Sequence, residues 1–219
     1  MRKLGISIYP GKTTEEELLS YIDKSFEAGF SRIFSCLLSS TDDKEIILKK
    51  FKKVNYYAKE KGFEIILDVN PRVFDNLGIS YDNLAFFKEM GADGIRLDIG
   101  FTGLQESIMT FNKENLKIEI NMSNDTHYID TIMDYRPNKN NLIGCHNFYP
   151  HIHTGLGLEF FKKCTENFTK YGLRTAAFIT SQAKNSFGPK PVTQGLPTLE
   201  MHRNLPLIVQ FKHFIALET

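Results

Sequence analysis

The sequence predicts an α/β fold, a parallel (β/α)8 barrel that stops after its seventh βα unit. Short apolar runs alternate with amphipathic helical segments along the whole chain, and successive runs start about 20 to 35 residues apart, the length of one βα unit. No hairpin signal joins neighbouring runs, which favours a parallel sheet covered by helices. A TIM-type barrel fits better than a doubly wound sheet, because no GxGxxG or GxxxxGKS/T motif follows the first run.

Seven apolar runs are predicted as strands. They are expected at residues 4–10, 32–38, 64–70, 94–100, 117–123, 142–150 and 174–180. The first helix should begin at Thr13 or Thr14, either of which can cap it, and end at Gly29. Further helices are expected at residues 44–61, 81–90, 156–172 and 198–217. No strand pattern follows residue 180, so residues 1–219 are expected to form a single, incomplete barrel domain without the eighth strand.

The composition gives no indication of a nucleic-acid or membrane partner. Lys and Arg number 27 against 26 for Asp and Glu, a formal net charge of +1, and no apolar stretch approaches the ~20 residues of a membrane span. The three cysteines, Cys36, Cys145 and Cys164, have no metal-ligand spacing and cannot form a complete set of disulfides. Nothing at the amino end resembles a signal peptide, so a cytoplasmic protein is expected. The sequence carries no indication of oligomeric state.

Polar residues interrupt the apolar pattern of three consecutive predicted strands. Side chains alternate between the two faces of a strand, so Asp68, Arg96, Asp98, Glu119 and Asn121 should face the barrel axis. They lie near the carboxyl ends of their strands, where barrel enzymes build their sites. A buried charge without a partner costs several kcal/mol, so these residues need pairing or a function. A self-contained salt-bridge network around Arg96 would explain any one of them, whereas the cluster favours a functional site.

The sixth predicted strand ends in further polar residues. His146 is either a base or a packed strand residue, and Asn147 and Tyr149 are suited to hydrogen-bond a ligand. His151 and His153 form an HxH pair, a pattern that can ligate zinc, although a polar loop lining the mouth is the preferred interpretation. We therefore predict acid–base chemistry that uses no metal and no cofactor.

A long loop rich in Pro and Gly occupies residues 183–206 and leads into the last predicted helix. Thr198 stands at the expected helix start, Arg203 lies about one turn further, and Lys190 is nearby. A helix N-terminus with such neighbours can hold an anion. An ordinary helix cap explains the same residues equally well.

Three motifs resemble one known family, and the resemblance runs along the full chain. GISIYP at residues 5–10, HNFYPHIHTGLG at 146–157 and PVTQGLPTLEMHRNLP at 191–206 resemble the MupG-type 6-phospho-N-acetylmuramidases, formerly catalogued as outer-surface proteins of unknown function. The resemblance implies an N-terminal barrel followed by a smaller β-rich domain, and the eighth strand and that domain are absent from this sequence. The implied reaction is hydrolysis of the β-1,4 bond between N-acetylmuramic acid 6-phosphate and N-acetylglucosamine, a step in peptidoglycan recycling.

Glycoside hydrolysis usually needs two carboxyl groups. Asp98, kept ionised by the neighbouring Arg96, is the candidate nucleophile or base. Asp68 or Glu119 is the candidate proton donor, with a pKa raised by the other carboxylates. The substrate acetamido group is an alternative nucleophile, which Asp98 would then orient.

The expected ligand is a phosphorylated amino-sugar disaccharide. The candidate substrate-binding residues are Arg96, Asn121, His146, Asn147, Tyr149, Thr198 and Arg203. Among them Arg96, Arg203 and the helix start at Thr198 are the candidates for holding the phosphate. A sugar-phosphate isomerase or aldolase, and a non-catalytic carbohydrate- or phosphate-binding module, are the alternatives.

Overall fold

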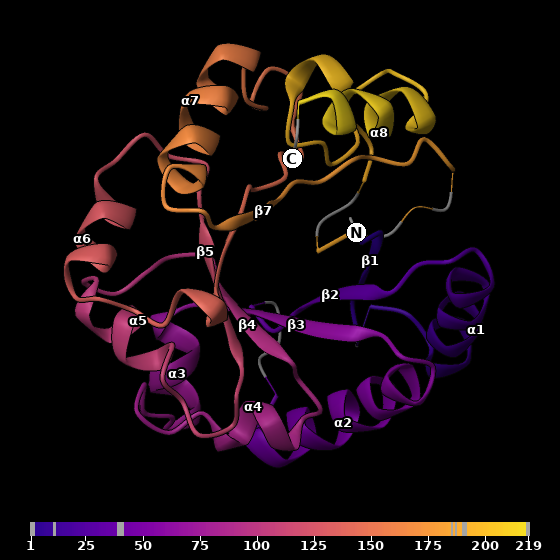
Figure 1. Ribbon diagram of the computed structural model, residues 1–219. Coiled ribbons are helices and arrows are strands. Elements are labelled where there is room, and N and C mark those ends of the chain that lie inside the picture. The colour runs from indigo at the N-terminus through magenta and orange to yellow at the C-terminus, as the bar shows by residue number, and fades with distance from the viewer. Residues whose placement is uncertain are drawn as a thin grey trace.

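The computed structural model describes residues 3–10, 12–38, 42–184, 186, 188–189 and 192–217. Seven strands in these residues form one parallel sheet, in which the strands follow one another in chain order. They are β1 (Gly5–Ile8), β2 (Arg32–Cys36), β3 (Glu64–Val69), β4 (Gly94–Leu97), β5 (Lys117–Asn121), β6 (Leu142–Cys145) and β7 (Arg174–Ala176). The sheet curls around a central axis with the helices outside it (Figure 1). The predicted α/β class and parallel order are confirmed.

The curled sheet is open between its two edge strands. Within the described residues β1 pairs only with β2, and β7 only with β6. A cavity of about 1500 Å³ runs along this opening, lined on one side by β1 and α1 (Glu15–Glu27) and on the other by β7 and α8 (Leu207–Ala216). The open sheet is consistent with the predicted barrel that stops after its seventh βα unit.

The other helices pack their apolar faces on the outside of the sheet. They are α2 (Lys44–Glu60), α3 (Pro71–Leu77), α4 (Ala85–Glu89), α5 (Leu104–Met109), α6 (Tyr128–Asp134) and α7 (Leu158–Thr169), with short 3₁₀ turns η1 (Lys139–Asn141) and η2 (Glu200–His202). Leu67, Ile95 and Ile118, which alternate with the polar strand residues, are fully buried in this core. The predicted division of β3, β4 and β5 into an outer apolar face and an inner face with polar residues is therefore confirmed. No helix in the described part of the chain is long and apolar enough to cross a membrane.

The predicted start of the first helix is also confirmed. Thr14 is the N-cap of α1. Its side chain accepts a hydrogen bond from the Glu17 backbone N–H, and the Glu17 carboxylate accepts one from the Thr14 backbone N–H. This reciprocal arrangement satisfies two of the N–H groups that a helix start leaves free. Gly29 follows the helix with a φ of 83°, a conformation that costs glycine little.

Between β3 and β4 the prediction missed one helix and made another too long. Asn70 caps α3 by accepting a 3.0 Å hydrogen bond from the Val73 N–H, Pro71 occupies the first helical position, and Gly78 ends the helix in the left-handed region. Asn-Pro at the start and Gly at the end are standard boundary signals that the apolar pattern alone did not use. The helix predicted at 81–90 is only the short α4.

The single helix predicted at 198–217 is wrong. The chain forms η2, breaks at Pro206 and only then begins α8. Proline lacks a backbone N–H and clashes with the preceding turn, so it starts a helix and cannot lie inside one without a kink. Thr198 therefore does not begin a helix.

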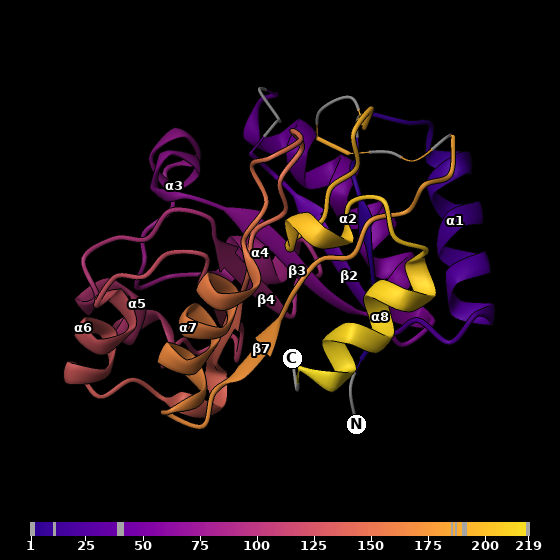
Figure 2. The same ribbon diagram turned by 90° about the horizontal axis from the view of Figure 1, so that it is seen from above.

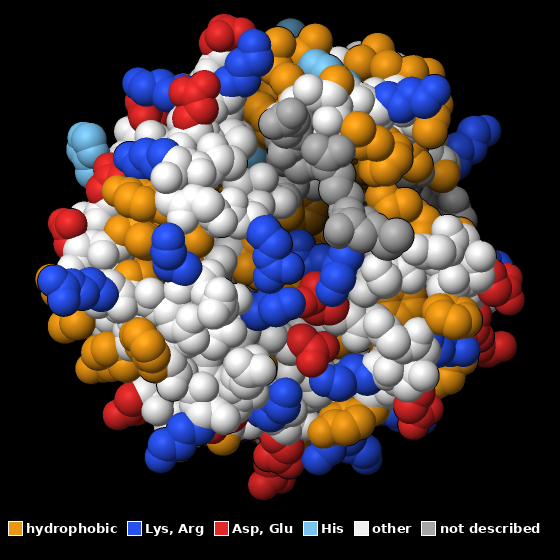
Figure 3. Space-filling model, in the orientation of Figure 1, with side chains coloured by type: hydrophobic (Ala, Val, Ile, Leu, Met, Phe, Trp, Pro, Cys, Tyr) orange, Lys and Arg blue, Asp and Glu red, His pale blue; other side chains and the backbone are white. Residues whose placement is uncertain are grey.

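Each end of the sheet carries its own cluster of charged side chains. Figure 2 shows the chain termini at one edge of the molecule and the loops after β6 and β7 at the opposite edge. At the amino ends of the strands Glu64 is surrounded by Lys3, Arg32 and Lys117, and Figure 3 shows basic side chains gathered around acidic ones near the centre of the face seen there. The polar cluster described next lies at the carboxyl ends.

Candidate functional site

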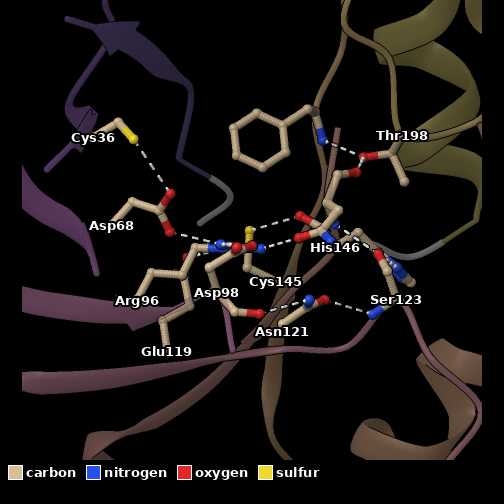
Figure 4. A network of polar contacts seen from close by, with 12 residues as sticks. Cys36, Asp68, Arg96, Asp98, Glu119, Asn121, Ser123, Cys145, His146 and Thr198 are labelled. Atoms are coloured by element: carbon tan, nitrogen blue, oxygen red, sulfur yellow. Dashed lines mark hydrogen bonds and ion pairs between the residues drawn. The ribbon is translucent and has the colours of Figure 1, made fainter. Parts of the chain in front are cut away.

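Arg96 is the centre of a cluster that joins three strands inside the barrel. Its Nη1 atom lies 2.6 Å from Asp68 Oδ1 and 3.2 Å from Asp98 Oδ1, and its Nη2 atom donates to Asn147 Oδ1 (Figure 4). Arg96 and Asp68 are almost completely buried, whereas the Asp98 side chain is 33 % exposed. One carboxylate is thus enclosed and the other is open to the mouth.

Strand register explains why these residues meet. Asp68 and Arg96 are direct partners in the β3–β4 pairing, and Asp98 follows Arg96 by two residues on the same face. The Asp98 backbone N–H still bonds to the Val69 carbonyl at 2.9 Å, which continues the sheet one step past β4. The alternation of side chains along β3 and β4, together with the strand register, therefore brings both carboxylates to one guanidinium.

Asp68 is a buried carboxyl group whose pKa is raised. Burial raises its pKa from 3.8 to about 6, the ion pair with Arg96 opposes that rise, and the nearby Asp98 charge adds to it. The predicted direction is therefore found, but burial is a larger cause than the neighbouring carboxylate named in the prediction. The Cys36 thiol, which the sequence did not indicate as part of this cluster, lies 3.6 Å from Asp68 Oδ2.

Glu119 faces the same interior but is enclosed by arginines. It is 1 % exposed, forms an ion pair with Arg32, and lies 3.9 Å from Arg96 Nε. Arg32 is the first residue of β2, so this pair lies toward the amino ends of the strands. The structure thus brings all three predicted carboxylates to Arg96, and it also contains the salt-bridge network that was the alternative explanation.

His146 is a core residue with both ring nitrogens occupied. Nδ1 lies 3.2 Å from Ser123 Oγ, Nε2 lies 3.0 Å from Thr165 Oγ1, and the ring stacks on Phe161 at 4.3 Å between centroids. Thr165 Oγ1 also lies 2.9 Å from the Phe161 carbonyl, and donation to that carbonyl favours the tautomer with the ring proton on Nε2. Burial lowers the pKa of His146 to about 3. The packed-residue alternative therefore holds, and the ring is no base at the mouth.

Asn121 supports the cluster through the backbone. Its Nδ2 atom donates to the Asp98 carbonyl at 3.0 Å, and its Oδ1 atom accepts from the Ser123 N–H at 2.9 Å. Ser123 in turn accepts the Asn147 N–H at 2.6 Å. The sequence analysis missed Ser123, although it continues the inward positions of the strand that carries Glu119 and Asn121.

The Arg203 side chain is buried and bonded to groups of the protein itself. It is 4 % exposed and donates to both carboxylate oxygens of Glu200, at 2.8 and 2.6 Å, and to the carbonyls of Tyr149 and Gln194, at 3.0 and 2.8 Å. Glu200 also accepts the backbone N–H groups of His153 and Gly155. This arrangement ties the loop after β6 to the loop before η2 and directs Nε, Nη1 and one N–H of Nη2 to partners inside the protein.

Thr198 is likewise used inside the protein. It is fully buried, its hydroxyl donates to the Asn147 carbonyl at 2.7 Å, and it accepts the Phe178 N–H at 2.9 Å. Arg96 is enclosed by its three partners. The three phosphate-binding candidates thus all have partners inside the protein, their role toward a phosphate stays a prediction, and Lys190 lies outside the described residues.

The HxH pair lies on the surface. His151 and His153 are exposed, and no group of three or more His, Cys, Asp or Glu side chains among the described residues is placed to hold a metal ion. Tyr149 is half-buried beside them, and its backbone N–H bonds to the Pro197 carbonyl.

The open parallel β/α sheet, with carboxylates on an arginine at its carboxyl edge, defines a protein built on the plan of the barrel enzymes, whose sites occupy this edge. A family model described as the N-terminal part of 6-phospho-N-acetylmuramidase matches residues 4–219. The chain therefore belongs to that family, as the motifs predicted.

Two solved structures resemble the chain along nearly its full length. An uncharacterised protein from B. cereus is 50 % identical with a TM-score of 0.88, and the match covers 99 % of this chain and 58 % of that one. A conserved protein of unknown function from Enterococcus faecalis is 27 % identical with a TM-score of 0.78, covering 92 % and 54 %. The chain thus spans little more than half the length of these two proteins. No curated protein matches the sequence.

Proposed function

We propose that the protein is a glycoside hydrolase that cleaves the β-1,4 bond between N-acetylmuramic acid 6-phosphate and N-acetylglucosamine, in peptidoglycan recycling in the cytoplasm. One observation carries the proposal: two carboxylates of different exposure share one buried guanidinium at the mouth of the sheet. The family description supports the choice of bond and sugar.

The two carboxylates are suited to different roles. Asp68 is enclosed, and a pKa near 6 leaves part of it protonated close to neutral pH, as a general acid requires. Asp98 is open to the mouth and paired with Arg96, so it is the candidate nucleophile or base. Glu119 is held by Arg32 and lies behind Arg96, so it acts on the site only through these arginines.

The spacing bears on the stereochemical course. Because Asp68 Oδ1 and Asp98 Oδ1 lie 2.6 Å and 3.2 Å from the same Nη1 atom, they are at most 5.8 Å apart, the sum of the two distances. Inverting enzymes hold their carboxyl groups ~6.5–9.5 Å apart, to leave room for a water molecule. The spacing therefore favours retention, with Asp98 as the nucleophile or as the residue that orients the acetamido group for that role.

The direct test is release of N-acetylglucosamine from the 6-phosphorylated disaccharide by the full-length natural protein. Cleavage of this substrate, with much slower cleavage of the unphosphorylated disaccharide, is the expected result. A folded protein that leaves the disaccharide intact would contradict the proposal. If it converts a simple sugar phosphate instead, the isomerase or aldolase alternative replaces it.

A further inference from the structure

Asn147 is held at three points, all of them on its backbone or its carbonyl oxygen. Its backbone N–H donates to Ser123 Oγ at 2.6 Å, and its backbone carbonyl accepts from Thr198 Oγ1 at 2.7 Å. Its side-chain Oδ1 accepts from Arg96 Nη2. The residue follows β6 by two positions and stands beside Asp98, which shares the same guanidinium.

These contacts fix which end of the amide faces the mouth. A guanidinium only donates hydrogen bonds, so Oδ1 must face Arg96 and Nδ2 must point away from it. Among the described residues Nδ2 has no hydrogen-bond partner, and it is not one of the buried polar atoms left unpaired, so it contacts solvent. The amide thus presents its two N–H groups to solvent, on the side away from the guanidinium that Asp98 also contacts.

A chain of hydrogen bonds through Ser123 and His146 holds Asn147 in place. Ser123 Oγ accepts the Asn147 N–H at 2.6 Å and lies 3.2 Å from His146 Nδ1, while His146 Nε2 lies 3.0 Å from Thr165 Oγ1. Ser123 and His146 therefore act on the site through Asn147.

The local charge selects the kind of acceptor. Asp68 and Asp98 place two carboxylates around one guanidinium, so an anionic ligand group next to Asn147 would be repelled. A neutral amide carbonyl suits the two N–H groups better, and the family description names an N-acetyl sugar. The 2-acetamido group sits on the carbon next to the reacting anomeric carbon, close to the position that Asp98 must reach.

We propose that Asn147 Nδ2 donates to the carbonyl oxygen of the substrate 2-acetamido group, and that Ser123 and His146 are positioning residues for this contact. The inference rests on the proposed function, because it takes the amino sugar as the ligand. It makes Asn147 the residue that distinguishes an N-acetyl sugar from its 2-hydroxy counterpart.

The test compares the affinities of N-acetylglucosamine 6-phosphate and glucose 6-phosphate for the full-length natural protein, by calorimetry. The wild type should prefer the acetamido sugar, and Asn147→Asp and Asn147→Leu should each reduce that preference by roughly 3- to 10-fold, the effect of one lost hydrogen bond. Asn124→Asp is the matched control, because this exposed residue undergoes the same chemical change and keeps its acceptor for Thr126. Ser123→Ala should weaken the preference, and Ser123→Thr should restore it.

Several outcomes would overturn the inference. A wild type without preference would do so, as would folded Asn147 variants that keep the full preference, or a loss of preference in Asn124→Asp as large as in Asn147→Asp. The proposed function fails separately: a protein that shows the Asn147-dependent preference but cleaves no disaccharide keeps the subsite and loses the glycosidase assignment.

Discussion

Arg96 Nη1 lies 2.6 Å from Asp68 Oδ1, and both side chains are almost completely excluded from solvent. The same nitrogen contacts Asp98, whose carboxylate is open to the mouth. A single buried cation thus compensates two carboxylates that differ in exposure, and it fixes the Asn147 amide as well. The chemistry of the site depends on this guanidinium although solvent barely reaches it.

Replacing Arg96 should damage both stability and activity. Arg96→Met leaves Asp68 buried without its cation, so the free energy of unfolding should fall by about 3–5 kcal/mol. Arg96→Lys keeps the charge but lacks the planar guanidinium with its several donors. Its free energy of unfolding should lie between those of the wild type and Arg96→Met. Chemical denaturation of both variants measures this. Arg72→Met, at an exposed position, should stay within about 0.5 kcal/mol of the wild type, and an equally small change in Arg96→Met would contradict the account.

Asp68 should titrate near neutral pH. Its pKa in the folded protein is raised from 3.8 to about 6, so the folded state binds more protons than the unfolded state between these values. The stability due to protonated Asp68 is therefore complete below pH ~4 and is lost as the pH rises toward ~6. A ¹³C NMR titration of the aspartate carboxyl groups should show one resonance with a pKa near 6 that disappears in Asp68→Asn. If the missing resonance titrates below 4, Asp68 is not the proton donor.

Acid should destabilise the protein through its buried histidines. Burial lowers the pKa of His146 to about 3 and that of His202 to about 4, from 6.5 in both cases. Below pH ~6.5 these histidines become protonated in the unfolded chain but stay neutral in the folded protein. The free energy of unfolding therefore falls by up to about 1.4 kcal/mol per pH unit for each histidine. Denaturation between pH 7.5 and 5 should show a smaller fall in His146→Gln. His127→Gln is the control, because the His127 side chain is 97 % exposed; equal slopes in all three proteins would refute the assignment.

Arg203 should matter for folding and not for phosphate binding. Arg203→Met removes the guanidinium and leaves Glu200 and two backbone carbonyls without their hydrogen-bond donor. The free energy of unfolding should therefore fall by about 3–5 kcal/mol. The affinity of the folded variant for glucose 6-phosphate should change less than about threefold. A tenfold loss of affinity at unchanged stability would instead restore Arg203 as a phosphate ligand.

The strand period was enough to predict where the carboxylates lie. Asp68, Arg96, Asp98 and Glu119 each alternate with apolar residues along their own strand, and parallel pairing in chain order brings such positions together. Their partners could not be ranked from sequence, because whether Arg96 takes Asp68 or Glu119 depends on side-chain reach across the barrel interior.

The loop residues were harder to assign. Thr198, Arg203 and His146 have the same residue types whether they bind a ligand or tie the chain to itself, and only the contacts across residues distant in sequence distinguish the two. The break at Pro206 was visible in the sequence, yet the apolar periodicity on either side of it hid two separate elements. Ser123 and Cys36 were missed because neither residue type stands out in a strand.

The most direct test of the central claim is cleavage of the 6-phosphorylated disaccharide by full-length Asp68→Asn and Asp98→Asn variants beside the wild type. Asp75→Asn, on the exposed face of α3, serves as the matched control. The account predicts at least a hundredfold loss of kcat/KM in both site variants, with folding intact and the control unaffected. Wild-type cleavage by a folded Asp98→Asn or Asp68→Asn protein would show that the carboxylates on Arg96 do not carry the reaction.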